Sequence, residues 1–355
     1  MFNFNNYDLT TNLWIFAAAA CAVWIAGTKI AIYADELAER FSLSRAMLGL
    51  LLLAGVTSLP EIATGFTAAL EGHPTLAVNN LLGGIAMQVA LLAVADVVIG
   101  KDALTSVVPN PMVMLQGAFN VCLLTFVAIT VLIGDVPFLG AGVGSWVIFS
   151  VAIYSFIKVH EADKHHPWVI NDPDNRNLGR EASPDGGEIE RPLKDDRLVW
   201  LITKALISAL AILFAGFIVA TVGDVIAGQT GLGVSFVGFA LVSIATSLPE
   251  ASTVFASVRR GLYTMAISDI LGTTAFNVAL LLGVDALSDG EPVLSRVGNF
   301  TAIGTLLGLA LTGLFLVGIV ERANRTFLRM GVDSAAILIA YSGGMVLLYS
   351  MRGDQ

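Results

Sequence analysis

Two copies of one pentapeptide carry the residues best suited to chemistry in this chain. Thr-Ser-Leu-Pro-Glu occurs at Thr57–Glu61 and again at Thr246–Glu250, each time inside a long apolar run. An ionisable residue inside a membrane-spanning segment is costly and usually marks a functional site. The two copies therefore predict one polar site that is built from both halves of the chain.

The pentapeptides offer only oxygen ligands. Proline has no N–H, so each proline deprives the carbonyl four residues earlier of its helical partner. Hard cations prefer carboxylate, hydroxyl and carbonyl oxygens, whereas softer metals prefer imidazole or thiolate, and neither pentapeptide region contains His or Cys. The candidate ligands are the carbonyls of Val56 and Ala245, the carboxylates of Glu61 and Glu250, and the oxygens of Thr57, Ser58, Thr246 and Ser247. They predict a site for Ca²⁺, Na⁺ or H⁺.

The similarity between the two regions extends far beyond five residues. Glu250 lies 189 residues after Glu61, and the same offset aligns residues 26–96 with the second half without a gap. Gly27 falls on Gly216, for example, in the run that precedes each pentapeptide. This register indicates a duplicated unit. It also disfavours the alternative that the Thr, Ser and Pro residues merely kink two packed helices.

Composition assigns the chain to a membrane. Of its 355 residues 56% are hydrophobic and 13% charged, and the mean hydropathy is +0.79, which leaves too little polar surface for a soluble protein. A span needs about 20 mostly apolar residues. Ten segments qualify: 12–34, 45–70, 75–98, 111–133, 138–158, 199–227, 234–258, 263–284, 298–320 and 330–351. Because five spans per half is an odd number, the second half must be inverted. We expect an all-α polytopic membrane protein with ten transmembrane helices as two inverted five-helix repeats.

The predicted halves are residues 1–158 and 199–355, joined by an acidic linker at 159–198. With the N-terminus outside, fifteen Lys and Arg residues fall in inside loops and two, Arg296 and Arg352, in outside segments. Cytoplasmic loops carry such an excess, so the linker is predicted to be cytoplasmic. Its acidity argues against nucleic-acid or anionic-lipid partners. We expect an integral protein of a prokaryotic plasma membrane, with the lipid bilayer as its surroundings and an oligomeric state that the sequence leaves open.

The helix after each pentapeptide carries a second polar set. Gln88 and Asn277 each lie five residues beyond a glycine and offer an amide oxygen to the ion; interhelical hydrogen bonding is the alternative. Asn80 and Asp269 lie on another face, and we interpret them as supporting or helix-end groups. On this interpretation the site holds two carboxylates, and its formal charge of −2 balances one Ca²⁺, two Na⁺ or two H⁺.

The paired pentapeptides and the helices after them resemble the alpha repeats of the sodium/calcium exchanger family, within the cation/calcium antiporter superfamily. The resemblance implies an antiporter that exports Ca²⁺ against inward Na⁺, needs no cofactor, and slides its first and sixth spans across the ions. It makes Glu61 and Glu250 the main Ca²⁺ ligands and adds Thr273 and Asn277 from the second repeat. The first repeat departs from the family pattern, with Gly84 in place of a serine and Gln88 in place of Asn or Asp.

These departures keep proton coupling open as an alternative to sodium coupling. A cation channel would use the same oxygen-rich path, but paired carboxylates in inverted repeats favour a carrier. An intramembrane enzyme would need a nucleophile with a base or a metal triad, and no His lies in either repeat core. We therefore expect no enzymatic activity.

Overall fold

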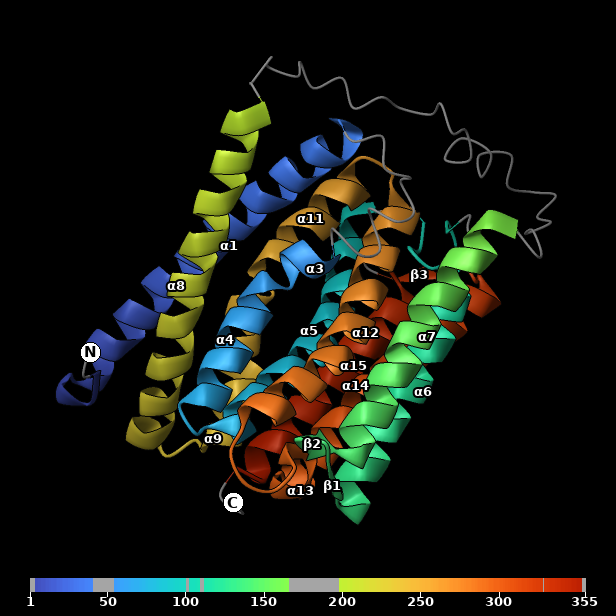
Figure 1. The fold of residues 1–355 in the computed structure, drawn as a ribbon. Coiled ribbons are helices and arrows are strands. Elements are labelled where there is room, and N and C mark those ends of the chain that lie inside the picture. Colours follow the sequence, from blue (N-terminus) through green and yellow to red (C-terminus); the bar gives the residue numbers. More distant parts are fainter. Residues whose placement is uncertain are drawn as a thin grey trace.

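The computed structural model describes residues 4–40, 54–99, 102–108, 112–165, 198–327 and 329–352, and helices dominate it (Figure 1). Helices satisfy their own backbone groups, as a lipid-exposed chain requires. The elements of the first half are η1 (Phe4–Asn6), α1 (Leu9–Arg40), α3 (Ala54–Thr57), α4 (Leu59–Leu70), α5 (Pro74–Ile99), α6 (Met112–Ile133), β1 (Pro137–Phe138), β2 (Ala141–Gly142) and α7 (Val143–His165).

The second half repeats this order after residues 166–197, which lie outside the described residues. Its elements are α8 (Leu198–Thr230), α9 (Val234–Phe236), the π-helical segment η4 (Val237–Val242), α10 (Ser243–Thr246), α11 (Leu248–Arg259), α12 (Tyr263–Leu287), α13 (Val293–Arg296), α14 (Asn299–Glu321), β3 (Thr326–Phe327), β4 (Met330–Gly331) and α15 (Val332–Ser350).

The described helices account for nine of the ten predicted spans. Eight are long and apolar enough to cross a membrane singly, and the ninth is the pair 234–246 and 248–259, bent by 49°. The remaining prediction, 45–70, is described only from residue 54, where α3 and α4 begin. The count of ten therefore stays a prediction. Helix α7 continues to His165, beyond the boundary predicted at 158, and the rest of the predicted linker is not described.

The duplication extends beyond the stretch in which the sequence revealed it. Pro137 pairs with Gly142 in the first β-hairpin, and Thr326 pairs with Gly331 in the second, 189 residues later. Helices α7 and α15 start at the same offset. Both halves therefore share one plan from the first helix to the last, although the sequence similarity fades after residue 96.

The two halves are inverted relative to each other. Helices α1 and α8, which are repeat equivalents, cross in opposite directions (Figure 1). Asn12 near the start of α1 donates a hydrogen bond of 3.0 Å to Gln229 near the end of α8, and Gln229 donates one of 2.7 Å to the Tyr7 carbonyl. Only antiparallel helices bring these ends together, so the inversion expected from the odd number of spans is confirmed.

Two buried aspartates fasten each half to the hairpin of the other. Asp96, in α5, accepts a hydrogen bond of 2.6 Å from the Gly331 N–H of the second hairpin. Asp285, in α12, accepts one of 2.8 Å from the Gly142 N–H of the first hairpin. Both contacts obey the 189-residue offset, so they form a symmetric brace that holds the halves as one body.

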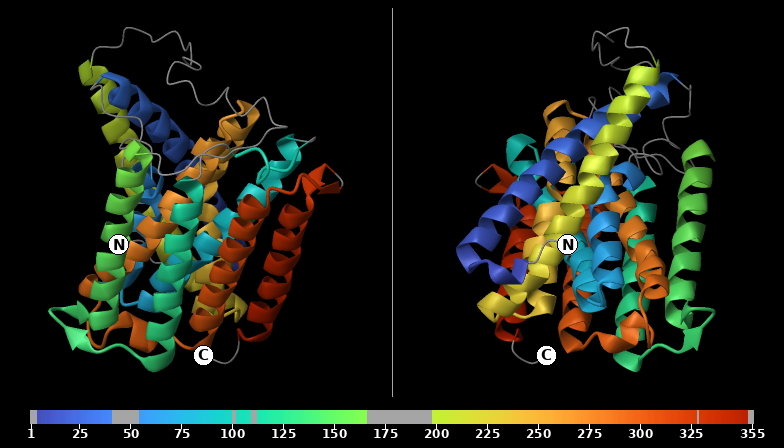
Figure 2. Two further views of the ribbon diagram at one scale, coloured as in Figure 1. Left: turned by 90° about the vertical axis from the view of Figure 1, so that its right-hand side faces the viewer. Right: turned by 60° about the vertical axis from the view of Figure 1, so that its left-hand side comes forward.

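The helices form a core and a separate pair. Helices α5 and α12 lie centrally, with α4 and α11 beside them and α6, α7, α14 and α15 along one side, while α1 and α8 lie tilted across the opposite side (Figures 1 and 2). Helix α5 is buried over most of its circumference. Large apolar side chains on the outer helices, such as Trp200 and Ile339, are exposed, as a lipid-facing surface requires.

Candidate cation-binding site

Each pentapeptide breaks its helix at the serine. Ser58 separates α3 from α4 with φ −79° and ψ 4°, and Ser247 separates α10 from α11 with φ −85° and ψ 7°. Pro60 and Pro249 follow two residues later, within the first turn of the new helix, where their missing N–H is tolerated. The same sequence thus produces the same break in both halves, as its prolines predict.

The breaks place both glutamates at helix N-termini in the interior. Glu61 lies in the first turn of α4 and Glu250 in the first turn of α11, and neither side chain is exposed. The N-terminus of a helix carries a partial positive charge that favours a carboxylate. The two carboxyl groups are also close enough to repel each other electrostatically. A cation between them would relieve that repulsion.

Seven buried polar side chains from both repeats share an unusual property. Each has at least one buried side-chain oxygen or nitrogen with no hydrogen-bond partner in the protein, although buried polar groups are nearly always paired. They are Ser58, Glu61, Gln88, Ser247, Glu250, Thr273 and Asn277. All seven are fully buried. The set supplies the oxygen-rich interior that a dehydrated cation needs, and every member was predicted from the sequence or from the family resemblance.

Each repeat contributes hydroxyl groups that lie next to the glutamate of the other repeat. Thr246 and Ser247 of the second repeat lie next to the Glu61 carboxyl, and Thr57 of the first lies next to that of Glu250. Neither carboxyl oxygen pair has a hydrogen bond of normal geometry. Each glutamate is therefore surrounded by hydroxyls from the opposite half, so neither half alone contains a complete site.

The two predicted carbonyl ligands occupy the helical turns before the breaks. Pro60 cannot donate to the Val56 carbonyl, nor Pro249 to that of Ala245, because proline has no N–H. Ala245 is buried and Val56 is half-buried. Both positions remain candidates through their backbone oxygens, and with Thr57 and Thr246 they complete the set of eleven residues proposed from the sequence.

Gly84 faces the centre of this site. A Cβ atom at residue 84 would lie 3.6 Å from the Ser247 hydroxyl oxygen and 3.7 Å from the Asn277 side-chain nitrogen, which are ordinary contact distances. A serine would therefore fit there. The departure from the family pattern at Gly84 therefore leaves no hydroxyl next to Ser247 and Asn277 at this position.

Close packing of α5 against η4 holds one wall of the site. A Cβ atom at Gly83 would lie 2.1 Å from the Phe239 carbonyl oxygen, and one at Gly238 would lie 2.8 Å from the Leu76 carbonyl oxygen. Only glycine permits such an approach of two backbones. The π-helical turn at 237–242, a distortion common near functional sites, immediately precedes the helix that carries Thr246.

Asp269 is buried beside Glu250. Predicted to be a supporting or helix-end group, it lies at 4% exposure in α12 and is close enough to Glu250 to repel it. The Thr253 hydroxyl donates a hydrogen bond of 2.8 Å to its carboxylate. Asp269 is thus a third carboxylate beside the site, whereas the sequence suggested only two, Glu61 and Glu250. The sequence did contain a signal for this placement. Asp269 follows Glu250 at the same spacing at which Asn80 follows Glu61, so the two residues occupy equivalent positions in the repeats.

The three carboxylates do not converge as ligands of one ion. Among the described residues, no group of three His, Cys, Asp or Glu side chains is placed to hold a metal. A cation between Glu61 and Glu250 would take its other ligands from hydroxyl, amide and carbonyl oxygens. That donor set fits Ca²⁺ or Na⁺ and gives no preference to softer metals.

The chain matches the sodium/calcium exchanger protein family over residues 11–158 and 200–351, which together cover most of its length. This protein belongs to the sodium/calcium exchanger family. Its membership agrees with the apolar helices in making it an integral membrane protein. CaxA of Alkalimonas amylolytica is 26% identical to it over 96% of this chain and 99% of CaxA. The inner membrane protein YrbG of Escherichia coli K12 is 24% identical over 76% of this chain and 79% of YrbG.

Two solved structures share the fold of this family member. The H⁺/Ca²⁺ exchanger CAX superimposes with a TM-score of 0.66 over 99% of this chain and 87% of CAX, at 13% sequence identity. The sodium-calcium exchanger NCX_Mj, soaked with Na⁺ and Sr²⁺, gives a TM-score of 0.61 over 96% of this chain and 99% of its own, at 16% identity. These likenesses establish the polytopic helical architecture predicted from the inverted repeats.

Proposed function

We propose that the protein is a secondary antiporter that exchanges Ca²⁺ for Na⁺ across the membrane by alternating access at the site between Glu61 and Glu250. The observation that carries the proposal is that seven fully buried polar side chains of the two repeats have atoms without hydrogen-bond partners in the protein, with the two glutamates close to each other among them. Family membership supports the reaction class. The crosswise glutamate and hydroxyl pairs supply the oxygens.

Charge balance favours exchange over uniport. The facing carboxylates of Glu61 and Glu250 repel each other in a buried setting, where a charge interaction is several times stronger than in water. A Ca²⁺ ion that leaves without replacement would expose this repulsion. Return of the empty carrier is therefore disfavoured, and monovalent cations that replace Ca²⁺ allow the return step. A cation channel, which needs a continuous water path, is the less favoured alternative to an antiporter.

The contacts of α1 and α8 support alternating access. A methyl group at Gly27 of α1 would meet the Pro249 side chain at 2.3 Å, whereas one at Gly216 of α8 would meet the Ala63 side chain at 2.5 Å. The repeat equivalent of Pro249 is Pro60, so the α8 contact lies three residues further along its partner helix, about 4.5 Å at 1.5 Å per residue. The pair α1 and α8 is therefore displaced from the symmetric position. Exchanging the two contacts generates a second state that faces the other side.

Proton coupling is the second candidate, and Gly84 favours it. The glycine leaves the site one hydroxyl oxygen poorer next to Ser247 and Asn277. A Na⁺ ion needs such neutral oxygens, whereas a proton needs only a carboxylate. Neither the Glu61 nor the Glu250 carboxyl receives a hydrogen bond of normal geometry from the protein, and each would accept a proton once Ca²⁺ has left.

We also propose that the end of the molecule at the start of α8 is cytoplasmic. The start of α8, the end of α7 and strand β3 lie together at this end, and the C-terminus lies at the other (Figure 1). Arg322 and Arg325 directly precede β3 at the predicted inside. The positive-inside rule supports this orientation in a prokaryotic plasma membrane.

Radioactive Ca²⁺ uptake into proteoliposomes tests the function. Vesicles loaded with Na⁺, and separately vesicles acidified inside, are diluted into ⁴⁵Ca²⁺ without the driving ion. We expect uptake from the Na⁺ gradient, reduced at least about 100-fold in Glu61→Gln and Glu250→Gln because each removes a charged ligand of a buried cation.

Glu161→Gln is the matched control, since Glu161 is an exposed residue of α7 that pairs with Lys158 and lies at the predicted cytoplasmic surface. It should transport like the wild type. Uptake driven only by the proton gradient would show that the coupling ion is H⁺ and not Na⁺. Full activity of the glutamine variants would refute the site.

A further inference from the structure

Asp269 is a buried carboxylate outside the ligand set. It lies in α12 at 4% exposure, where Thr253, three residues after Glu250, donates a hydrogen bond of 2.8 Å to it. The Thr253 hydroxyl oxygen also lies 3.0 Å from the Glu250 carbonyl oxygen, so its single proton is shared between the two acceptors. Asp269 is thus attached to the first turns of α11, the helix that presents Glu250, and its charge acts on the Glu250 carboxyl.

The first repeat fills the same position with a neutral amide. Asn80 donates a hydrogen bond of 2.9 Å to Thr64, the equivalent of Thr253, and accepts one of 3.3 Å from Thr246. Thr64 in turn bonds the Pro60 carbonyl at 2.8 Å. Asn80 therefore connects α5 to α4 in the way that Asp269 connects α12 to α11. An amide satisfies the packing of this fold, so the packing does not require the charge.

Burying a charge is expensive even when it is hydrogen-bonded. The second repeat therefore contains a destabilising buried negative charge at a position where the first repeat has a neutral amide. Within a membrane protein such a charge is expected to act on the transported ion. Because Asp269 does not converge with Glu61 and Glu250 as a ligand of one metal, it acts on the bound cations through its field.

We propose that Asp269 sets the number of monovalent cations that the carrier exchanges for each Ca²⁺. The inference rests on the proposed function and extends it. With Asp269, three carboxylates surround the site and balance three monovalent cations; without it, Glu61 and Glu250 balance two. A third monovalent cation would then carry an excess positive charge in a low-dielectric interior, which is unfavourable. Ca²⁺ needs only the glutamate pair and is affected less.

The test measures the coupling ratio in proteoliposomes. Fixed gradients of Ca²⁺ and of the driving ion, Na⁺ or H⁺, are imposed, and net ⁴⁵Ca²⁺ flux is measured over a series of membrane potentials. Exchange of three monovalent cations per Ca²⁺ moves one net charge and reverses at a potential that the gradients set, whereas exchange of two is electroneutral and its flux does not depend on the potential. We expect about three monovalent cations per Ca²⁺ in the wild type and about two in Asp269→Asn, from the charge balance above. Because Asn80 already fits the equivalent position, the substitution should preserve folding, which a monodisperse elution profile and an unchanged melting temperature would verify.

The swap variant Asn80→Asp/Asp269→Asn is the matched control. It restores three carboxylates with the charge moved beside Glu61, so the ratio should return to about three. An unchanged ratio in Asp269→Asn would overturn the proposal, and so would a lowered ratio that the swap leaves lowered, since that result would indicate a local steric role.

Ion counting separates failure of this inference from failure of the proposed function. Calorimetric titration of detergent-solubilised protein with Na⁺ counts bound ions without any transport. If the wild type shows no exchange with Na⁺ or H⁺, the proposed function fails. The inference then stands only if the wild type binds one Na⁺ more than Asp269→Asn, and equal numbers overturn it.

Discussion

At the scale of single residues, the two repeats differ where their chemistry differs. The pentapeptides are identical, but Gly84 faces the site where its equivalent Thr273 carries a hydroxyl, and Gln88 replaces the shorter amide of Asn277. The second repeat thus supplies more neutral oxygen than the first. Together with Asn80 opposite Asp269, these differences within the duplicated frame are the positions at which ion choice can be altered.

Gly84→Ser should strengthen Na⁺ binding. The new Cβ has contacts of 3.6 Å and 3.7 Å, so the side chain fits and brings a hydroxyl beside Ser247. We expect a rise in Na⁺ affinity of about fivefold, equivalent to about 1 kcal/mol for one neutral oxygen contact. Competition of Na⁺ with ⁴⁵Ca²⁺ binding measures it, with Gly84→Ala as the control that adds the carbon but no oxygen. Equal affinities in the two variants would contradict the expectation.

At the scale of helices, glycine positions decide where α1 and α8 can rest on the core. Gly27 and Gly216 each leave room for one side chain of a site-bearing helix, whereas Gly228 of α8 has nothing within 4 Å of an added Cβ. Gly216 and Gly228, two glycines of the same helix, therefore differ in their packing. Their contacts, rather than their type, identify the positions on which sliding depends.

Gly216→Ala should impair the protein, and Gly228→Ala should not. A methyl group at residue 216 would lie 2.5 Å from the Ala63 side chain, so α8 must move away from α4. Overpacking of this kind costs about 1–3 kcal/mol, whereas alanine for glycine at an open helical position gains up to about 1 kcal/mol. Melting temperature and the rate of ⁴⁵Ca²⁺ exchange would both fall for the first variant. Indistinguishable variants would show that this contact does not limit the position of α8.

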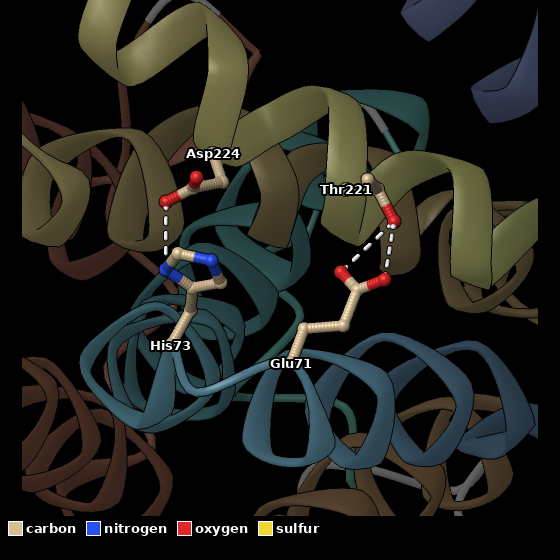
Figure 3. A network of polar contacts seen from close by, with 4 residues as sticks. All are labelled: Glu71, His73, Thr221 and Asp224. Atoms are coloured by element: carbon tan, nitrogen blue, oxygen red, sulfur yellow. Dashed lines mark hydrogen bonds and ion pairs between the residues drawn. The ribbon is translucent and has the colours of Figure 1, made fainter. Parts of the chain in front are cut away.

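At the scale of the whole molecule, one set of polar contacts fastens α8 to the turn between α4 and α5 (Figure 3). The Thr221 hydroxyl donates to the Glu71 carboxylate at 3.0 Å, and His73 lies 3.1 Å from the Asp224 carboxylate. The repeat equivalents of Glu71 and His73 are Arg260 and Leu262, so the inverted half carries different side chains at these two positions. The set belongs to one end of the molecule and to one position of α8.

Removing these contacts should shift the balance between the two carrier states. In Thr221→Val/Asp224→Asn the displaced position of α8 loses about 1 kcal/mol, which is roughly a fivefold change in the population ratio, since the pair is partly exposed. Spin labels at Leu213 of α8 and Ile129 of α6, two exposed positions, report the distance distribution in a variant without native cysteines. Thr203→Val is the control, because the Thr203 hydroxyl bonds the Val199 carbonyl of its own helix. Identical distributions in both variants would rule out a role for this contact in setting the state.

The sequence alone predicted the site residues and determined the inverted plan. A doubled pentapeptide in one register predicts two identical helix breaks, because proline lacks an N–H wherever it stands, and an odd number of spans requires inversion. Those consequences are local or topological, so they do not depend on tertiary contacts.

Only the tertiary structure decided which groups meet. The pairing of Glu61 with Thr246, the burial of Asp269 beside Glu250 and the three-residue offset of α8 all depend on how helices far apart in sequence register against each other. Helix periodicity assigns a residue to a face, but the packed neighbour of that face is set by side-chain volumes summed over the whole bundle. A carboxylate one face away from the site on its own helix could therefore still belong to it.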